Sequence, residues 1–337
     1  MPTRSQKGTR TRAFEAWLAL GNLIGTHLMV IVPTGVAIGV LFPQVLLPLK
    51  PLVPTFFAVM TFQNALSNDL RAMRRALARP LLPLAVLVMV HVVMPLLVFA
   101  VSTLLFGPGS PTVAGVVLEY SVPIGASAIM WIGMFGGDLA LGLATLLAST
   151  LLSPFTIPFT LKLLVGTTVQ IDTSSMMANM AYMVAIPALV ATVLNEVSHG
   201  WCQRVAAPTT TPLSRLLLPL IVATNATGIS EPLHHLTPRL VGIMTLMLVF
   251  AVGSFCAGML VARWLSRPTD GDAHAIDQPR FVALSFCCGI RNVTAGAVLA
   301  TQYFGPEVLF PAIIATPFQQ VLAATFGRIM ERALSHR

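Results

Sequence analysis

Apolar runs of about 20 residues, the length that one helical crossing of a bilayer requires, follow one another along almost the whole chain. Hydrophobic residues make up 55% of the 337 residues and charged residues only 9%, whereas soluble domains carry about 25% charged residues. The sequence therefore predicts an all-α, multi-pass membrane protein with ten transmembrane helices. They are expected at residues 24–43, 47–66, 81–107, 112–134, 139–165, 175–195, 213–230, 240–264, 281–304 and 308–330.

The basic residues test this count. With a cytoplasmic N-terminus, 16 of the 20 Lys and Arg fall in cytoplasmic segments, as the positive-inside rule requires. Lys50, Lys162 and Arg239 fall in segments on the outer side of the membrane, and Arg291 lies within the ninth apolar run. The net charge of +8 is spread over short connections and forms no basic stripe that would indicate nucleic acid. We expect a protein of the bacterial inner membrane with both termini in the cytoplasm.

The same topology divides the chain into two halves. Residues 1–23 are expected to be a cytoplasmic tail, residues 24–165 and 166–330 to hold five helices each, and residues 331–337 to be a second cytoplasmic tail. Because five is odd, the second half enters the membrane in the opposite direction. This predicts an inverted repeat.

Two of the predicted helices, the fourth and the ninth, contain residues that interrupt helices. The fourth contains Pro123 and Gly125, and the ninth contains Gly289 just before Arg291. Proline removes a backbone donor and glycine tolerates a break. Interrupted helices at equivalent places in two repeats indicate a transporter's substrate site, although Pro123 could also simply kink a packed helix.

Arg291 places a positive charge inside the predicted membrane region, which costs free energy. A charge at mid-bilayer costs at least roughly 2.5–3.5 kcal/mol on insertion scales, so such a residue normally serves a substrate, an ion or a partner. The guanidinium either attracts a substrate anion directly, or locks the region through its fixed charge, or pairs with Glu119, the only carboxylate deep in a predicted span. His91 is a candidate for carrying protons or, alternatively, a packing residue.

Several motifs resemble those of the bile acid:sodium symporter family. Residues 123–129 (PIGASAI) are similar to the family's P-G-G-T-A-S-N in its broken fourth helix, and residues 137–141 (GDLAL) to its G-(N/D)-V-A-L. Residues 149–154 (STLLSP) look like its S-T-L-x-(A/S)-P, and residues 287–292 (CCGIRN) align with its E-x-G-M-Q-N. The order and spacing of these motifs resemble the family from about residue 24 to residue 333.

The resemblance implies a core domain in which the two broken helices cross, beside a panel domain made of the first, second, sixth and seventh helices. It also implies a secondary transporter of organic anions such as bile salts or pantoate, usually driven by sodium. Sodium prefers oxygen ligands, and this chain lacks most of the family's oxygen-bearing residues. Their places are taken by Ala128, Ile129, Gly142, Leu146, Cys287 and Arg291, with His91 at or next to a family Gln.

We therefore expect a sodium-independent transporter of a small or amphipathic organic anion, without metal or other cofactor and with a proton as a possible coupling ion. Membrane lipid is the other expected partner. A non-transporting sensor or channel-like relative is the alternative, and an intramembrane enzyme, for which the usual zinc and serine motifs are missing, is remote. The expected substrate-binding residues are Arg291, Asn292, Thr294, Gln319, Gln320, Ala126 and Ser127, with Glu119 and His91 for coupling or ion pairing.

Overall fold

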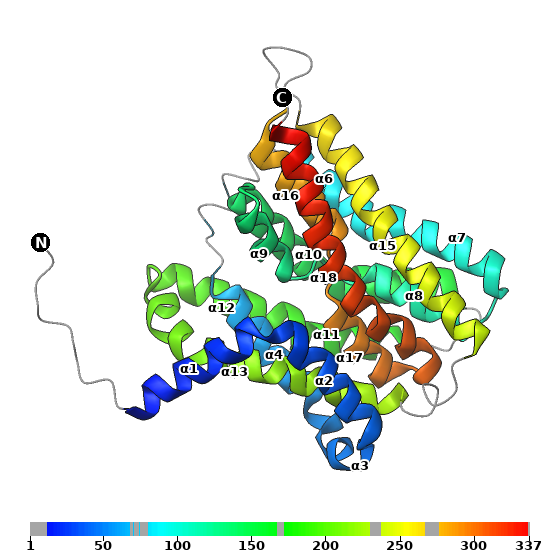
Figure 1. Ribbon diagram of the computed structural model, residues 1–337, viewed down its shortest axis with the longest axis horizontal. Helices are drawn as coiled ribbons and strands as arrows, with labels where there is room; N and C mark the ends of the chain where they lie inside the picture. Colours follow the sequence, from blue (N-terminus) through cyan, green and yellow to red (C-terminus); the bar gives the residue numbers. More distant parts are fainter. Residues whose placement is uncertain are drawn as a thin grey trace, which may run out of the picture.

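The computed structural model describes residues 12–67, 70, 74, 80–166, 172–229, 237–266 and 276–335. All regular elements in these ranges are helices, so the predicted all-α fold is confirmed (Figure 1). The α-helices are α1 (Arg12–Thr26), α2 (Leu28–Leu41), α3 (Pro43–Leu46), α4 (Val53–Ala65), α6 (Leu81–Val88), α7 (Met94–Phe106), α8 (Pro111–Ser121), α9 (Ser127–Met134), α10 (Leu139–Val165), α11 (Thr173–Met180), α12 (Ile186–Val197), α13 (Trp201–Ala226), α15 (Pro238–Leu265), α16 (Gln278–Gly289), α17 (Val293–Tyr303) and α18 (Pro306–Ser335). Short π-helical turns at Met89–Val93 and Ala181–Ala185 join α6 to α7 and α11 to α12.

Seven helical segments of the described part are long and apolar enough to cross a membrane. The pair α1 and α2, which is bent by 85°, brings the number to eight. The ten-span prediction requires two further, interrupted spans, α8 with α9 and α16 with α17. With 11 residues, α8 alone covers about 16 Å of a hydrocarbon core about 30 Å thick, so the ten-span count depends on joining these halves and stays a prediction.

One group of helices packs around α13, and we call it the panel group. It consists of α1, α2, α4, the continuous helix α11–α12, and α13, which lie together in the lower part of Figure 1. In α2, Gly35 and Gly39 face α13: a Cβ at Gly35 would lie 3.2 Å from the Pro219 carbonyl oxygen, and one at Gly39 would overlap Ala223. These glycines let two helices approach closely without any large side chain between them.

The segment expected to be an N-terminal tail is partly helical. Residues 12–23 form most of α1, and residues 1–11 lie outside the described part of the chain. The Trp17 indole donates to the Thr209 carbonyl at 2.9 Å, and Arg215 of α13 donates to the Asn22 side chain at 2.9 Å. Helix α1 is therefore fastened to the panel group.

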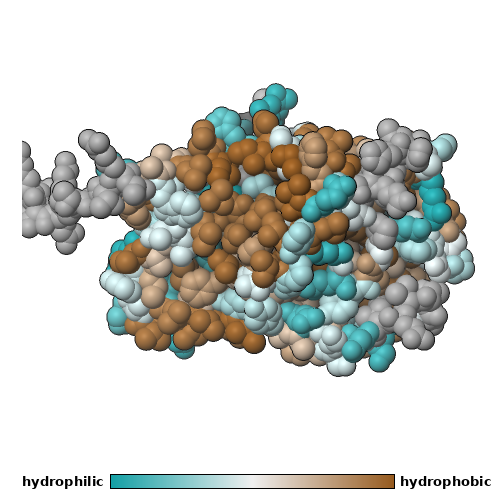
Figure 2. Space-filling view, turned by 90° about the horizontal axis from the view of Figure 1, so that it is seen from below, coloured by the Kyte–Doolittle hydropathy of each residue, from teal (hydrophilic) through white to brown (hydrophobic). Residues whose placement is uncertain are grey.

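Apart from the four-residue α3, which contacts α2 and α13, the remaining helices, α6 to α10 and α15 to α18, form the second group, which we call the core group. Aromatic rings fill part of its interior, where Phe255 stacks on Phe326 with ring centroids 4.9 Å apart. The outer surface of the molecule also carries large exposed apolar side chains, among them Leu104, Phe159 and Leu260. Broad apolar areas are visible on the face shown in Figure 2. An apolar exterior over apolar helices is what an integral membrane protein presents to lipid.

In the core group, the first residues of corresponding helices are separated by a constant number of residues. Helix α8 begins at Pro111 and α16 at Gln278, which is 167 residues later, and the same 167 residues separate the starts of α10 at Leu139 and α18 at Pro306. Each half thus contains a short helix, a break, a second short helix and a long helix. The regular spacing agrees with a duplicated unit, and the inverted orientation of the two copies stays a prediction.

Candidate functional site

The two interrupted helices meet at their breaks. Ile124, between α8 and α9, forms an isolated antiparallel bridge with Arg291, between α16 and α17. The Gly125 amide donates to the Ile290 carbonyl at 3.1 Å, and the Asn292 amide donates to the Pro123 carbonyl at 2.8 Å. Backbone groups released from helical bonding at one break are thus satisfied by the other. Helix α8 ends at Ser121 and α9 begins at Ser127, so Pro123 and Gly125 lie in the first break; α16 ends at Gly289 and α17 begins at Val293.

Close approach at the crossing depends on glycine. A Cβ on Gly125 would lie 2.5 Å from the Arg291 carbonyl oxygen, which is shorter than any ordinary contact. At the other break, the ring of Phe255 lies against Gly289 so closely that a side chain there would overlap it. Each break therefore carries a glycine for a steric reason.

The two hydrogen bonds of the crossing are related by a local two-fold arrangement. Gly125 and Asn292 both donate, Pro123 and Ile290 both accept, and 167 residues separate the members of each pair. This is the spacing found between the helix starts of the two halves. The two residues of the antiparallel bridge at the crossing are separated by the same interval as the helix starts.

Gln319 of α18 holds the second break. Its Oε1 accepts from the Arg291 amide at 2.7 Å, and its Nε2 donates to the Arg291 carbonyl at 2.9 Å. The side chain is only 8% exposed. Because both ends of the amide are engaged by backbone, Gln319, which we expected to contact substrate, acts here as a clamp on the break.

Two other expected substrate residues also hold helices in place. The Asn292 side chain caps α17 by accepting from the Ala295 amide at 3.2 Å. Gln320 accepts from the Trp131 indole at 3.1 Å and donates to the Ser127 hydroxyl at 3.5 Å, which ties α18 to α9. These polar side chains set the positions of the first turns of α9 and α17.

The Arg291 guanidinium points into the core group, where the side chain is 3% exposed. Its Nη1 donates to the Val90 carbonyl at 3.3 Å, and its Cζ lies 5.9 Å from the centroid of the Tyr120 ring. Within the described residues its Nε and Nη2 have no hydrogen-bond partner. A cation in this position is held by a carbonyl dipole and an aromatic face.

Glu119 is also buried, at 2% exposure, and precedes Tyr120 on α8. A Cβ added to Gly296 of α17 would lie only 2.6 Å from the Glu119 Oε2. This oxygen has no hydrogen-bond partner among the described residues. In this part of the chain Glu119 and Arg291 do not form a direct ion pair. The two side chains are opposite charges placed in one apolar interior without contact.

His91 lies in the π-helical turn Met89–Val93 and is bonded at both ring nitrogens. Nε2 pairs with the Ser149 hydroxyl at 2.9 Å and Nδ1 with the Thr156 hydroxyl at 3.1 Å. The Ser149 oxygen also accepts from the Ile124 amide at 3.1 Å. The π-helical turn therefore contacts both breaks. His91 is linked to Ile124 at the first break through the Ser149 hydroxyl, and the Val90 carbonyl accepts from Arg291 at the second.

Sequence reasoning did not assign Ser149, Thr156 or Val90 a role. Only Ser149 carried a signal, because it opens the S-T-L-L-S-P stretch that resembles the family motif. A π-helical turn has no clear sequence signature, although such turns are common at functional sites. Val90 contributes through its backbone carbonyl, which any residue has.

A cavity of about 370 Å³ opens between the panel and core groups at the first turn of α9. This volume lies within the range of small-molecule sites, roughly 300–1,000 Å³. Ala126 contributes to the cavity, together with residues of α10. Ser67, Gln203, Ala207 and Thr211 also line it, and they fall in the connections 67–80 and 197–212, which the predicted ten-span topology places in the cytoplasm. Lining residues include Gln63, Asn64, Ile129, Met130, Leu143 and Gln203.

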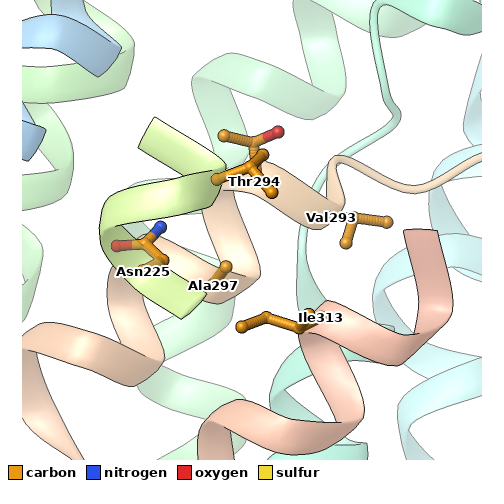
Figure 3. Close-up of a pocket in the computed structure, with 6 residues that line it drawn as sticks. Asn225, Val293, Thr294, Ala297 and Ile313 are labelled. Carbon is orange, nitrogen blue, oxygen red and sulfur yellow. The ribbon is translucent and has the colours of Figure 1, made fainter. Parts of the chain in front are cut away.

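A second, much smaller cavity of about 10 Å³ lies at the first turn of α17, between α13, α17 and α18 (Figure 3). Thr294 lines this cavity with Asn225 and Ile313. A space of this size holds about one water molecule. The seam between the panel and core groups therefore has a large cavity beside α9 and a very small one beside α17. Of the seven expected substrate residues, Ala126 lines the first and Thr294 the second, and the other five line neither.

The position of the family's fifth-helix serine is closed by apolar side chains. A Cβ on Gly142 would lie 2.7 Å from the Ile132 Cδ1 and 3.3 Å from the Ile129 Cδ1. Cys287, at the place of the family's ninth-helix glutamate, is buried as well. Neither position carries an oxygen-bearing side chain in this chain.

Known proteins support the resemblance. The profile of the Sodium Bile acid symporter family matches residues 54–236. The chain is also 32% identical over 300 residues to "Uncharacterized protein YbaS" of Bacillus subtilis (strain 168), an alignment that covers 89% of this chain and 95% of the relative. By the family match and by this similarity over nearly its full length, the chain belongs to the sodium bile acid symporter family.

Proposed function

We propose that this protein moves a small or amphipathic organic anion across the membrane by alternating access and does so without sodium. The observation that carries the proposal is the pairing of the two interrupted helices, with a cavity of about 370 Å³ at the first turn of α9 and one of only about 10 Å³ beside α17. Transporters with interrupted helices bind solute at such breaks, where half-helix ends face the site. The structure then corresponds to the inward-facing conformation.

The cavity beside α9 suits a single negative charge on a partly apolar body. The first turn of α9 directs backbone amides and the positive end of its dipole toward the cavity at Ala126. Met130, Leu143 and Leu146 offer apolar surface, and Asn64 offers a neutral amide. Its lining among the described residues includes no charged side chain, so an anion there would be bound by dipoles.

Arg291 would serve as a fixed cation that locks the crossing. Its head group lines neither cavity, and it contacts the Val90 carbonyl and the Tyr120 ring on the core side of the break. A permanently charged guanidinium cannot leave as a sodium ion does. This arrangement favours the locking role over direct attraction of the substrate, and it accounts for transport that needs no sodium.

The test is uptake by the purified protein in proteoliposomes. Cholate is a suitable first probe, because the family is described by bile acid transport and cholate carries one carboxylate on an apolar, hydroxylated body. Saturable uptake that changes less than about twofold when sodium is replaced by choline would support the proposal. Counterflow of labelled cholate against unlabelled cholate would separate a carrier from a channel-like or sensing relative.

A steep rise of uptake with sodium concentration would remove the sodium-independent part of the proposal. No uptake and no counterflow, from protein that is folded and correctly inserted, would remove transport of this class of anion altogether. The two results are therefore distinguishable.

A further inference from the structure

Asn225 of α13 carries a buried hydrogen-bond donor that is not used within the described chain. The residue is 1% exposed. Its Oδ1 accepts from the Thr301 hydroxyl of α17 at 3.1 Å, whereas its Nδ2 has no partner among the described residues. Buried amide donors in proteins are nearly always satisfied. An unused donor on a residue that lines a cavity therefore needs an acceptor from outside the chain, which is either a water molecule or a polar group of a ligand.

Asn225 is one of the residues that line the small cavity beside α17 (Figure 3). Opposite Asn225 lie Val293 and Thr294, the first two residues of α17, whose amides have no intrahelical acceptor. Ala297 and Ile313 close the cavity with apolar groups. Amides of a helix start, a hydroxyl and the Asn225 Nδ2 can all donate, so the matching ligand group is an acceptor such as a carboxylate oxygen.

The position of this cavity corresponds to that of the larger one. Val293 and Ala297, which line the small cavity, follow Ala126 and Met130, which line the larger one, by 167 residues, the spacing that relates the two breaks. Helix α17 faces Asn225 of α13 as α9 faces Asn64 of α4. Both cavities thus combine the first turn of a half-helix from the core group with a side-chain amide from the panel group.

From these observations we infer that Asn225, Thr294 and the first turn of α17 form an outer carboxylate site, which the substrate occupies when the protein faces outward. This inference rests on the proposed function and deepens it, because it assigns separate carboxylate contacts to the two sides of the membrane. With a volume of about 10 Å³ the site is closed in the present conformation. Separation of α17 from α13 opens it.

The experiment compares both directions of cholate transport in proteoliposomes. Asn225→Asp keeps an acceptor for Thr301 but replaces the free donor by a negative charge. We expect the KM for cholate entering from the outer side to rise at least about tenfold, while the KM from the inner side stays within about twofold. Thr301→Val is the matched control, since it removes the bond to Oδ1 but leaves Nδ2 in place, and its outer KM should not change.

Thr294→Val provides a second variant if Asn225→Asp folds poorly, and it should also raise the outer KM. Equal outer KM values for the wild type, Asn225→Asp and Thr294→Val would overturn the outer site while leaving the transport function intact. A rise of equal size on both sides would overturn it as well, because a general defect would then explain the result. Failure of the wild type to move cholate would instead remove the proposed function and this site with it.

Discussion

The side-chain amide of Gln319 engages both backbone polar groups of Arg291, accepting from its N–H at 2.7 Å and donating to its carbonyl at 2.9 Å. The residue at the second break is thus held from α18, 28 residues further along the chain. Neither the charge of Arg291 nor the length of its side chain enters this contact. The backbone at the second break is therefore held by a contact that does not involve the guanidinium, in addition to the guanidinium's own contacts with the Val90 carbonyl and the Tyr120 ring.

Replacement of Gln319 by Leu should destabilise the protein clearly. Two hydrogen bonds are lost, and a buried N–H and carbonyl are left without partners, at about 1–3 kcal/mol for each unsatisfied group. We expect a lower melting temperature in detergent. Gln320→Leu is the neighbouring control and should have a smaller effect, because it leaves only side-chain groups of Trp131 and Ser127 unbonded. Equal losses for the two variants would contradict the clamp.

Gly125→Ala should impair the crossing itself. Its Cβ would lie 2.5 Å from the Arg291 carbonyl oxygen, and overpacking of this kind typically costs about 1–3 kcal/mol. Gly133→Ala in α9 is the matched control, because its Cβ would meet only the Leu139 Cδ2 at 3.6 Å. The melting temperature and the cholate flux should both be lower in Gly125→Ala than in the wild type, and neither should change in Gly133→Ala. A harmless Gly125→Ala would mean that the two breaks do not approach as described.

Arg291→Gln distinguishes a lock from a direct substrate contact. Because the head group lines neither cavity, we expect lower stability and a lower maximal rate, with a KM for cholate changed by less than about threefold. Loss of a direct charged contact would instead raise KM by about tenfold or more. Initial rates over a range of cholate concentrations, in sodium and in choline, give both parameters.

Glu119→Gln, alone and combined with Arg291→Gln, completes this comparison. Since the two side chains do not form a direct ion pair in the described part of the chain, we expect the double variant to be no better than Arg291→Gln alone. Recovery of transport in the double variant would show instead that charge balance between the two residues limits the single variants. A double-mutant cycle on melting temperature gives the same comparison without a substrate.

Tyr303→Phe should loosen the closed side of the seam. The Tyr303 hydroxyl of α17 accepts from Asn179 and donates to the Ser175 carbonyl at 3.1 Å, both in α11. We expect faster labelling of Thr294→Cys by a membrane-impermeant thiol reagent added outside, in a background with Cys202 and Cys256 replaced. The buried Cys287 and Cys288 can stay.

Tyr182→Phe is the control for this labelling. Its hydroxyl pairs with Thr55 at 3.3 Å inside the panel group and does not cross the seam. Labelling rates that rise equally in both tyrosine variants would indicate general loosening of the protein and would argue against a contact that holds this side closed.

The sequence predicted the interruptions of the two helices because their causes are local. Pro123, Gly125 and Gly289 disturb a helix through their own backbone chemistry. It also predicted the helical class, since apolar runs of this length leave few other structures in lipid. Where a helix begins was less certain, as α1 shows by starting at Arg12, well before the expected span.

The roles of the polar residues could not be predicted in the same way. Gln319, Gln320 and Asn292 were expected around one substrate, whereas their bonds fix the crossing and the helix starts. Which donor meets which acceptor depends on how α18 packs against the breaks, and no periodicity in the sequence encodes that. The direction in which the Arg291 head group points could not be predicted from the sequence for the same reason.

The reciprocal bonding of the breaks has a consequence for how the protein can be made. Either half produced alone would leave one amide and one carbonyl of its break stranded in hydrocarbon, since Gly125 and Pro123 depend on Ile290 and Asn292. Separate fragments of the chain, divided between α10 and α11, should therefore be degraded singly and accumulate only when both are synthesised in the same cell.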